Sequence, residues 1–200
     1  MTPRRPDSFY RKAKREGFEA RSIYKLQELD RKYKILKPSQ RVLDLGAAPG
    51  SWLQYASSRV GEKGFIVAVD VNALRADVAS PQVEFVQSDI CRIDTDRVTE
   101  KAKEYDVVLS DVAPRTTGDP AGDHERSFEL SCCALTIAVS VLARGGTFVC
   151  KMYQGAHGTE FQKQMEMHFE FVKSQKPKAS RSESREVFFV ALNFRPGRGA

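Results

Sequence analysis

Long apolar runs are missing from this chain of 200 residues, and we expect no secretory leader. No stretch of 18 consecutive apolar residues occurs, although 41% of the residues are hydrophobic, so the sequence predicts an ample core and no membrane span. The opening MTPRRPDSFYRKAKR is charged and lacks the apolar segment of a signal peptide. We therefore expect a cytoplasmic protein that does not contact a membrane.

Cysteines are few, and they lack the spacing of a zinc site or of a disulfide framework. The four are Cys91, Cys132, Cys133 and Cys150, and no two of them form a C-x-x-C pair. Cys132 and Cys133 are adjacent in a segment with a helical pattern, which suits neither kind of site. The sequence therefore predicts idle or buried thiols and no metal site.

The G-x-G-x-x-G pattern that holds a dinucleotide pyrophosphate is also absent. After the apolar run 42–45 the chain continues with GAAPG at 46–50. Small residues directly after a buried strand leave room for a ligand to lie against the backbone before a helix begins. The loop predicts a nucleoside cofactor without a phosphate group. It argues against an NAD-dependent oxidoreductase, as does the lack of a persuasive histidine for hydride transfer.

Positive charge, by contrast, is concentrated at both ends of the chain. Residues 1–37 hold 12 Lys and Arg against 5 Asp and Glu, residues 173–200 hold 7 against 2, and the middle holds 13 against 19. Basic ends around an acidic centre are typical of a protein whose ends bind a polyanion while its centre has another task. A solvated basic tail without a partner would give the same pattern.

Short apolar runs alternate with helical patterns along most of the chain. The expected strands are 42–45, 65–71, 83–87, 106–110, 146–150, 169–173 and 186–194. The expected helices are 23–37, 51–60, 94–104, 125–143 and 158–167, with only a short helix after Asp70. The alternation predicts an α/β, Rossmann-like fold with a seven-stranded, mostly parallel sheet and helices on both faces. No helix separates the last two strands, so we expect the last strand to be antiparallel.

We expect a single domain over 1–200. Within it, residues 1–37 form a basic arm and helix, residues 38–194 form the catalytic sheet core, and residues 195–200 form a short basic tail. In such a sheet the ligand crevice lies beyond the carboxyl ends of the strands, where the strand order reverses around the first strand.

Acidic residues follow two of the expected strands at this edge. Asp70 lies 24 residues after Gly46, about where an acid accepts hydrogen bonds from a ribose diol, and Asp89 is placed to meet an adenine amino group. Either acid alone can equally be a surface carboxylate or a helix cap. Trp52, the only tryptophan, lies two residues past Gly50 and is expected beside the same pocket, although core packing would also explain it. Together these residues predict an adenosine pocket.

Four more charged residues are expected to converge on the same edge. Asp111 closes the fourth strand, Lys151 closes the fifth, Glu186 opens the seventh, and Lys25 lies on the first long helix. A lysine at the end of an apolar strand must either pair or reach solvent. A purely structural ion pair between Lys151 and Asp111 is therefore the alternative to a catalytic role.

Four separated stretches, DLGAAPGSW, SDVAP, FVCKMYQG and SRSESREVFFVA, carry a resemblance to a known family. They resemble the FtsJ family of S-adenosylmethionine-dependent RNA ribose 2'-O-methyltransferases, and the likeness runs from about Phe9 to Phe194. With RSIYKL near the start and PAGDHERS after the fourth strand, the chain is most similar to the bacterial type that methylates a uridine ribose in large-subunit ribosomal RNA. Ser51 departs from the family pattern, because many members have a second glycine there.

The resemblance implies S-adenosylmethionine as the cofactor and a role for each matching residue. The matches to cofactor-contacting positions are Gly50, Trp52, Asp70, Asp89 and Asp111. The matches to the catalytic tetrad are Lys25, Asp111, Lys151 and Glu186, with Lys151 in the place of the proton acceptor. Two versions of its role stay open: a neutral base, or a charged group that orients the 2'-oxygen while a carboxylate or water takes the proton.

The resemblance also implies ribosomal RNA as the partner, within an assembled large subunit, and we expect a monomer. Candidate phosphate-binding residues in the basic arm are Arg4, Arg5, Arg11, Lys12 and Arg21, with Phe9, Tyr10 and Tyr24 as possible stacking surfaces. The alternatives are a transfer RNA or messenger cap substrate, and a non-catalytic RNA-binding ribosome assembly factor. A length of 200 residues without an added domain favours the ribosomal type, and a complete tetrad argues against the non-catalytic one.

Overall fold

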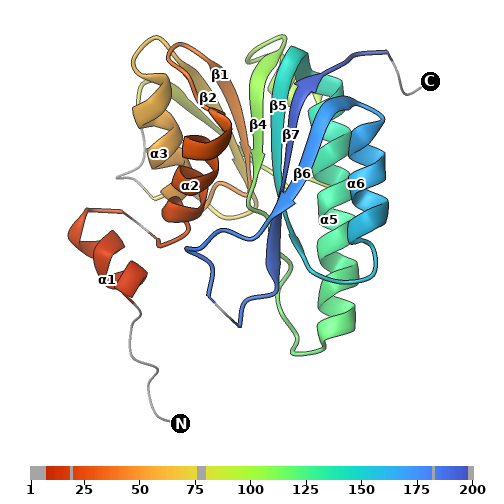
Figure 1. The fold of residues 1–200 in the computed structure, drawn as a ribbon. Coiled ribbons are helices and arrows are strands. Elements are labelled where there is room, and N and C mark those ends of the chain that lie inside the picture. The colour runs from red at the N-terminus through yellow and green to blue at the C-terminus, as the bar shows by residue number, and fades with distance from the viewer. Residues whose placement is uncertain (1–7, 19, 76–79, 182, 198–200) are drawn as a thin grey trace.

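One seven-stranded sheet organises the chain (Figure 1). The computed structural model describes residues 8–18, 20–75, 80–181 and 183–197. The strands are β1 (Arg41–Leu45), β2 (Phe65–Asp70), β3 (Val83–Gln87), β4 (Tyr105–Ser110), β5 (Leu142–Tyr153), β6 (Phe169–Gln175) and β7 (Glu186–Phe194). The helices are α1 (Ser8–Arg15), α2 (Ile23–Tyr33), α3 (Ser51–Val60), α4 (Asp96–Thr99), α5 (Pro120–Val141) and α6 (Gly158–Glu166).

The strand order is β3-β2-β1-β4-β5-β7-β6, and every pair from β3 across to β5 is parallel. β7 lies between β5 and β6 and is antiparallel to both. The predicted mostly parallel sheet with an antiparallel last strand is therefore confirmed. The order reverses beside β1, because β2 and β3 extend from one side of β1 and β4 from the other.

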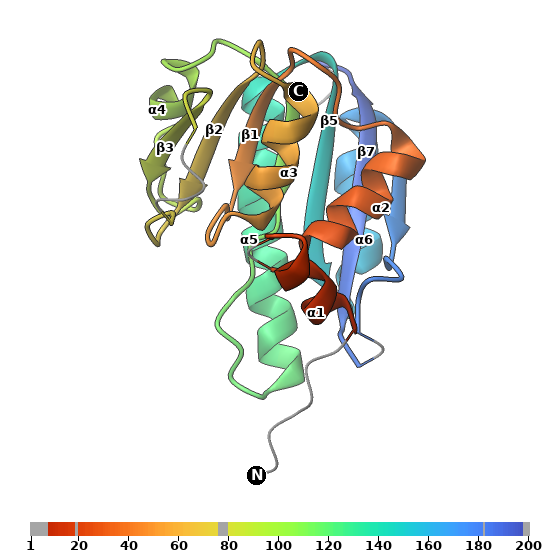
Figure 2. The ribbon, with the colours of Figure 1, turned by 90° about the vertical axis from the view of Figure 1, so that its left-hand side faces the viewer.

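Helices cover both faces of the sheet, with α2 and α3 on one face and α5 and α6 on the other (Figure 2). Successive side chains of a strand point to opposite faces, so each strand contributes to two cores. In β5, Val149 packs with α2 and α3, whereas Cys150 and Met152 pack with α5 and α6. Odd-numbered residues at the end of β5 therefore face α2, which decides where Lys151 points.

Several elements differ from the prediction at their ends, and β5 extends beyond the expected 146–150 in both directions. α2 ends at Tyr33 instead of reaching residue 37, because Lys34 adopts a left-handed conformation with φ of 56°. α5 begins at Pro120, five residues earlier than expected. Its cap residue Asp119 accepts hydrogen bonds from the N–H groups of Ala121 and Gly122.

Two predicted helices are shorter or absent. The helix expected over 94–104 is the four-residue α4, and residues 71–75 form no helix. Residues 76–79, where the rest of the short helix after Asp70 was expected, lie outside the described residues. Within the described part of the chain, no helix has both the length and the apolar character needed to cross a membrane.

The carboxyl edge of the sheet gathers the ends of several strands. The loop after β1, the last residue of β2 and the first residues after β4 all lie there, because these strands are parallel. β7 runs the opposite way, so its first residue Glu186 lies at this edge too, opposite Tyr153 at the end of β5. Groups from distant parts of the sequence therefore meet at one place.

Candidate active site

Lys151 and Asp111 form a buried ion pair at the carboxyl edge. Lys151 Nζ lies 2.9 Å from Asp111 Oδ1 and donates a hydrogen bond of 2.6 Å to the backbone oxygen of Asp111. β4 and β5 are parallel neighbours with Ser110 opposite Cys150, so the next residue on each chain continues this register. The sheet thus brings together two residues that are 40 positions apart in the sequence.

A second buried ion pair lies on the same face. Lys25 Nζ of α2 is 2.6 Å from Glu186 Oε1, and about a tenth of each side chain is exposed. Glu186 is opposite Tyr153, which shares a face of β5 with Lys151 because the two are separated by one residue. The structure therefore brings all four predicted residues to one face of one edge.

Charge neighbours set the protonation states of these groups. Burial alone would lower the pKa of Lys151, but nearby Asp111, Tyr153 and Glu186 raise it above its usual value. Burial alone would raise the pKa of Glu186, but Lys25 holds it below its usual range. At neutral pH the Lys151 ammonium and the Glu186 carboxylate are therefore both charged.

The glycine loop after β1 passes close to this cluster. Gly46 has φ of +77°, and a Cβ on it would lie 2.6 Å from Val112 Cγ2 and 3.0 Å from Val112 Cα. A side chain is therefore excluded there on both conformational and steric grounds. Val112 directly follows Asp111, so the glycine loop 46–50 lies beside the ion pairs. We call the loop and the acids around it the cradle. Gly50, with φ of 119°, ends the loop at the start of α3.

Asp70 fixes the shape of the loop. Its Oδ2 accepts a hydrogen bond of 3.0 Å from the N–H of Ala48, and its Oδ1 accepts one of 2.8 Å from the N–H of Asn72. The carboxylate is almost fully buried. It lies between the end of β2 and the glycine loop, at the place where the sequence predicts a ribose-binding acid.

Asp89 and Trp52 differ in what they offer to a ligand. Asp89 is half-buried, and its Oδ1 accepts a hydrogen bond of 2.9 Å from the N–H of Cys91. Trp52 is 2% exposed, its ring lies 5.7 Å from that of Phe188, and its Nε1 donates to the backbone oxygen of Ser22. The indole therefore packs in the core. Only the backbone of Trp52, in the first turn of α3, is available to a ligand at the loop.

Asp44 is a buried acid that was not expected from the sequence. It is fully buried in β1, and neither carboxyl oxygen has a hydrogen-bond partner. Burial, together with nearby Asp111 and Asp70, raises the pKa of Asp44 to about 8. The available signal was a charged residue inside an apolar strand, in VLDLG.

These acids suit a cationic nucleoside cofactor. Asp44, Asp70 and Asp111 lie close enough to interact electrostatically, and the carboxyl of Asp44 has no partner of its own. Gly46 keeps the backbone of the loop bare beside them. S-adenosylmethionine carries positive charge on its sulfur and on its amino group, which the carboxylates of Asp70 and Asp111 would stabilise, while the protonated carboxyl of Asp44 could donate a hydrogen bond. The residues present therefore fit that cofactor.

Replacement of Asp44 by asparagine is expected to change how stability depends on pH. The pKa of Asp44 is about 8 in the folded chain, whereas the unfolded value is near 4, so between these values the folded state alone keeps the proton. Wild-type stability therefore falls as pH rises from about 4 to 8 and then levels. The melting temperature of the variant should exceed that of the wild type by a margin that widens to about 5 °C or more at pH 8. Thermal melts from pH 5 to 9 without cofactor measure this, and a constant margin would contradict it.

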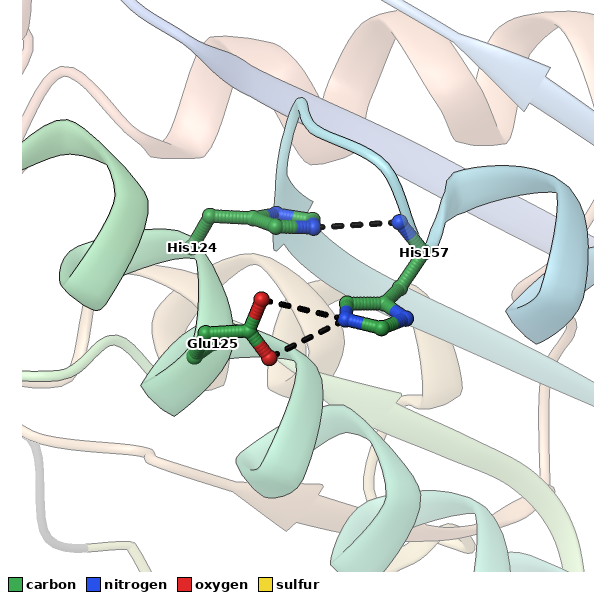
Figure 3. Close-up of side chains that lie close together, drawn as sticks. All are labelled: His124, Glu125 and His157. Carbon is green, nitrogen blue, oxygen red and sulfur yellow. Dashed lines mark hydrogen bonds and ion pairs between the residues drawn. The ribbon is translucent and has the colours of Figure 1, made fainter.

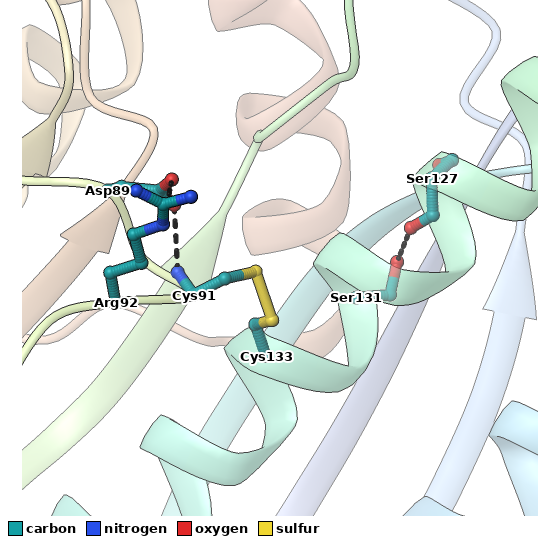
Figure 4. Close-up of a disulfide and its surroundings, with 6 residues drawn as sticks. All are labelled: Asp89, Cys91, Arg92, Ser127, Ser131 and Cys133. Carbon is teal, nitrogen blue, oxygen red and sulfur yellow. Dashed lines mark hydrogen bonds and ion pairs between the residues drawn. A yellow bond between two sulfur atoms is a disulfide. The ribbon is translucent and has the colours of Figure 1, made fainter.

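Cys91 and Cys133 form a disulfide (Figure 4), so the prediction of idle thiols is wrong for this pair. Their Cα atoms are 5.2 Å apart across 42 positions of sequence. Cys133 points from α5 towards the loop after β3, whereas its neighbour Cys132 remains a free thiol, as does the buried Cys150. Spacing along the chain could not reveal a bond between a loop and a helix that the fold brings together.

Reduction is expected to lower stability through this bond alone. The disulfide closes a long loop, which typically contributes about 2–4 kcal/mol to the free energy of unfolding. Addition of a dithiol reductant should therefore lower the melting temperature of the wild type. Cys132→Ser supplies a matched control on the next residue and should respond to the reductant like the wild type, whereas Cys133→Ser should not respond. An equal response of both variants would contradict the pairing.

The predicted RNA-binding residues fall into three groups. Arg4 and Arg5 lie outside the described residues, and Arg11 and Lys12 are exposed on α1. Arg21 is half-buried and donates to the backbone oxygen of Ala179, which places it beside the loop between β6 and β7.

Tyr24 is not a stacking surface. It is 5% exposed, its hydroxyl donates to Glu16, and its ring lies 5.6 Å from that of Phe9. Tyr24 therefore packs in the core, and the expectation of a stacking surface is wrong for this residue. Tyr10 is 44% exposed on α1 and keeps an accessible ring.

His124, Glu125 and His157 lie together at the start of α5 (Figure 3). Among the described residues they are the one group whose composition would suit a metal ion. His157 Nε2 contacts Glu125 and His157 Nδ1 contacts Glu160, which raise the pKa of His157. The imidazole rings of His124 and His157 are stacked, with 12° between their planes. Stacked rings cannot direct their in-plane lone pairs at a common ion without turning, so we assign the group to hydrogen bonding.

Comparisons with known proteins match nearly the whole chain. The model of a family described as FtsJ-like methyltransferase matches residues 18–194. A relative from Oleidesulfovibrio alaskensis, named ribosomal RNA large subunit methyltransferase E, is 44% identical over 191 residues, which cover 94% of this chain and 92% of that protein. A relative of the same name from Bdellovibrio bacteriovorus is 40% identical, covering 96% of this chain and 99% of that protein.

A solved structure shares the fold of the chain. It is a crystal structure of a Plasmodium falciparum protein provisionally described as a ribosomal RNA methyltransferase. Its TM-score is 0.79 at 31% identity, and the match covers 88% of this chain and 98% of that one.

Proposed function

This chain belongs to the FtsJ-like methyltransferase family, and from this premise we propose that it methylates the ribose 2'-oxygen of a uridine in large-subunit ribosomal RNA. S-adenosylmethionine is the proposed methyl donor and the assembled large subunit the proposed substrate, met by a monomer in the cytoplasm. The relatives named for large-subunit ribosomal RNA support the substrate class. The observation that carries the proposal is the meeting of two buried ion pairs, Lys151 with Asp111 and Lys25 with Glu186, beside the glycine loop.

We assign binding to the loop and the acids around it. Gly50 and the backbone of Trp52 would hold one side of the cofactor, Asp70 would accept hydrogen bonds from its ribose hydroxyls, and Asp89 would accept one from its adenine amino group. Asp111 belongs both to this pocket and to the tetrad, where it pairs with Lys151. When bound, the cofactor supplies a methyl group that is already electrophilic because it is attached to a positively charged sulfur.

The remaining task of the protein is to orient the 2'-oxygen and to accept its proton. A hydroxyl held in line at near-attack distance gains much of the rate from positioning alone. The raised pKa of Lys151 keeps it protonated, which favours the version in which its ammonium orients the oxygen. Asp111 or water then takes the proton as the new bond forms. Lys25 and Glu186 hold the position of this pair from α2 and β7.

A transfer assay tests the proposal directly. Large ribosomal subunits from cells that lack this protein are incubated with it and with S-adenosylmethionine carrying a tritiated methyl group. We expect label in the RNA as a 2'-O-methyluridine, located by nuclease mapping. Absence of label from the large-subunit RNA, or label only in transfer RNA, would refute the proposed substrate.

Arg11 and Lys12 on α1 are proposed to bind RNA phosphates. Each phosphate contact makes the affinity depend more steeply on salt concentration. A double variant that combines Arg11→Ala and Lys12→Ala should therefore reduce the slope of log affinity against log salt concentration by about 1–2. Filter binding at several salt concentrations measures the slope. Lys63→Ala, in the turn between α3 and β2, removes an exposed lysine elsewhere and should leave the slope unchanged. Equal slopes for all three proteins would contradict the role of α1.

A further inference from the structure

The end of β5 that carries Lys151 extends beyond its neighbour β4. The last pair between the two strands is Ser110 opposite Cys150, whereas β5 continues to Tyr153. On the other side β7 accompanies β5 to its end, with Glu186 opposite Tyr153. Backbone groups of successive residues point alternately to the two sides, and the N–H of Gln154 donates to Arg185 on the β7 side. The backbone groups of Tyr153 and Lys151 therefore point to the side where β4 has ended.

Polar side chains of α5 replace the missing strand. Ser127 Oγ accepts a hydrogen bond of 2.9 Å from the N–H of Tyr153, and His124 Nδ1 lies 2.8 Å from the oxygen of Tyr153. Ser131 Oγ lies 3.3 Å from the backbone oxygen of Lys151. Its shorter hydrogen bond, of 2.7 Å, is to the backbone oxygen of Ser127 in its own helix. Figure 4 shows Ser127 and Ser131 one turn apart on α5. These three side chains are 2–3% exposed and lie on one face of the helix, at a position normally taken by apolar residues.

The hydrogen bonds fix the tautomer of His124. A carbonyl oxygen only accepts, so the proton lies on Nδ1 and points at Tyr153. Nε2 then accepts a hydrogen bond of 3.1 Å from the N–H of His157, as Figure 3 shows. A Cβ on Gly155 would lie 2.3 Å from the His124 ring, so the turn after β5 packs directly on the imidazole. His124 thus ties both the strand end and the following turn to α5.

We propose that Ser127 and His124 are positioning residues for methyl transfer: they hold the Tyr153 peptide at the unpaired end of β5 and thereby fix Lys151 against Asp111. This inference rests on the proposed function, because it needs Lys151 at the reacting oxygen. Neither residue touches the ion pair, and each acts through the strand backbone. A displacement of about 1 Å at a reacting group can reduce turnover about 100-fold, so loss of either hydrogen bond is expected to lower turnover rather than binding.

A pair of serine variants on α5 tests the inference. Ser127→Ala removes the acceptor for Tyr153, whereas Ser140→Ala makes the same change at an exposed serine that bonds within its own helix. With undermethylated large subunits and labelled S-adenosylmethionine, we expect kcat of Ser127→Ala to fall about 10- to 100-fold. The KM for large subunits and the KM for S-adenosylmethionine should both stay within about twofold of the wild-type values, and Ser140→Ala should match the wild type in kcat and KM. If Ser127→Ala melts at a lower temperature but keeps the kcat of Ser140→Ala, its role is structural and the proposal is overturned.

Two variants of His124 separate its hydrogen bonds. Asparagine places an amide N–H near the position of Nδ1 and retains the donor to Tyr153, whereas glutamine reaches the position of Nε2 and retains the acceptor for His157. His124→Asn is expected to keep kcat within about threefold of the wild type, and His124→Gln to lose about as much as Ser127→Ala. Equal activity of the two, or a more active glutamine variant, would overturn the role of the Tyr153 contact. Failure of the wild type to methylate any large subunit would instead refute the proposed function.

Discussion

Lys151→Ala is expected to lower the rate of methyl transfer by about 10²- to 10⁴-fold while the affinity for S-adenosylmethionine changes by less than about threefold. The ammonium of Lys151, on β5, lies 2.9 Å from Asp111 Oδ1. The glycine loop, by contrast, follows β1, and its shape is fixed by Asp70. The variant therefore loses the group that orients the 2'-oxygen and keeps the pocket. Single-turnover transfer to large subunits and equilibrium binding of tritiated cofactor measure the two quantities separately.

The matched control is Lys173→Ala, which removes an exposed lysine from β6 and should change neither quantity. Equal losses of binding and turnover in Lys151→Ala would mean that Lys151 is a structural member of a buried ion pair. That is the alternative the sequence left open. A fall in melting temperature alone would not decide the matter, because Asp111 loses its partner in either case.

The dependence of the rate on pH distinguishes the two roles of Lys151. Its pKa is raised above the usual lysine value, so its charge stays constant from pH 6 to 9. With chemistry rate-limiting, the wild-type rate should therefore be nearly flat over this range. A rate that climbs about tenfold per pH unit would instead identify Lys151 as a base that acts only after losing its proton.

The alternation of strands and helices was the predictable part of the fold. A strand pairs with its neighbours and buries a short apolar run, so its existence is visible in the sequence at 42–45 or 106–110 without knowledge of its partners. The meeting of Asp111 and Lys151 was also predictable, because parallel strands place their carboxyl ends on one edge. Because β7 is antiparallel, its first residue Glu186 lies at that edge too.

Features that neither strand polarity nor a periodic pattern specifies were not predictable. The disulfide joins Cys91 in a loop to Cys133 on a helix, and no spacing rule links them. The length of β5 beyond β4 is visible only in the assembled sheet, so Ser127 and His124 looked like ordinary helix residues. Asp44 was hidden for the opposite reason: it lies in a recognised strand, and only the structure shows that its carboxyl has no partner.

Asp70→Ala is expected to have the reverse effect of Lys151→Ala. The carboxylate accepts from Ala48 and Asn72, and we propose that it also receives the ribose hydroxyls of the cofactor. Two hydrogen bonds to a charged group contribute about 1.5–3 kcal/mol each, so the Kd for S-adenosylmethionine should rise about 100-fold or more. At saturating cofactor, kcat should fall by less than about fivefold, because the tetrad lies on other elements than β2.

Two further variants separate loop shape from ligand contact at Asp70. Asp70→Asn keeps one carbonyl oxygen for Ala48 or Asn72 but loses the charge, so it should lie between the wild type and Asp70→Ala in cofactor affinity. Asp94→Ala removes an exposed acid that caps a turn elsewhere and should leave the Kd unchanged. An unchanged Kd with a lost kcat in Asp70→Ala would place this acid in catalysis instead of binding. Asp70 on β2 would then act in methyl transfer, and its proposed role in cofactor binding would be wrong.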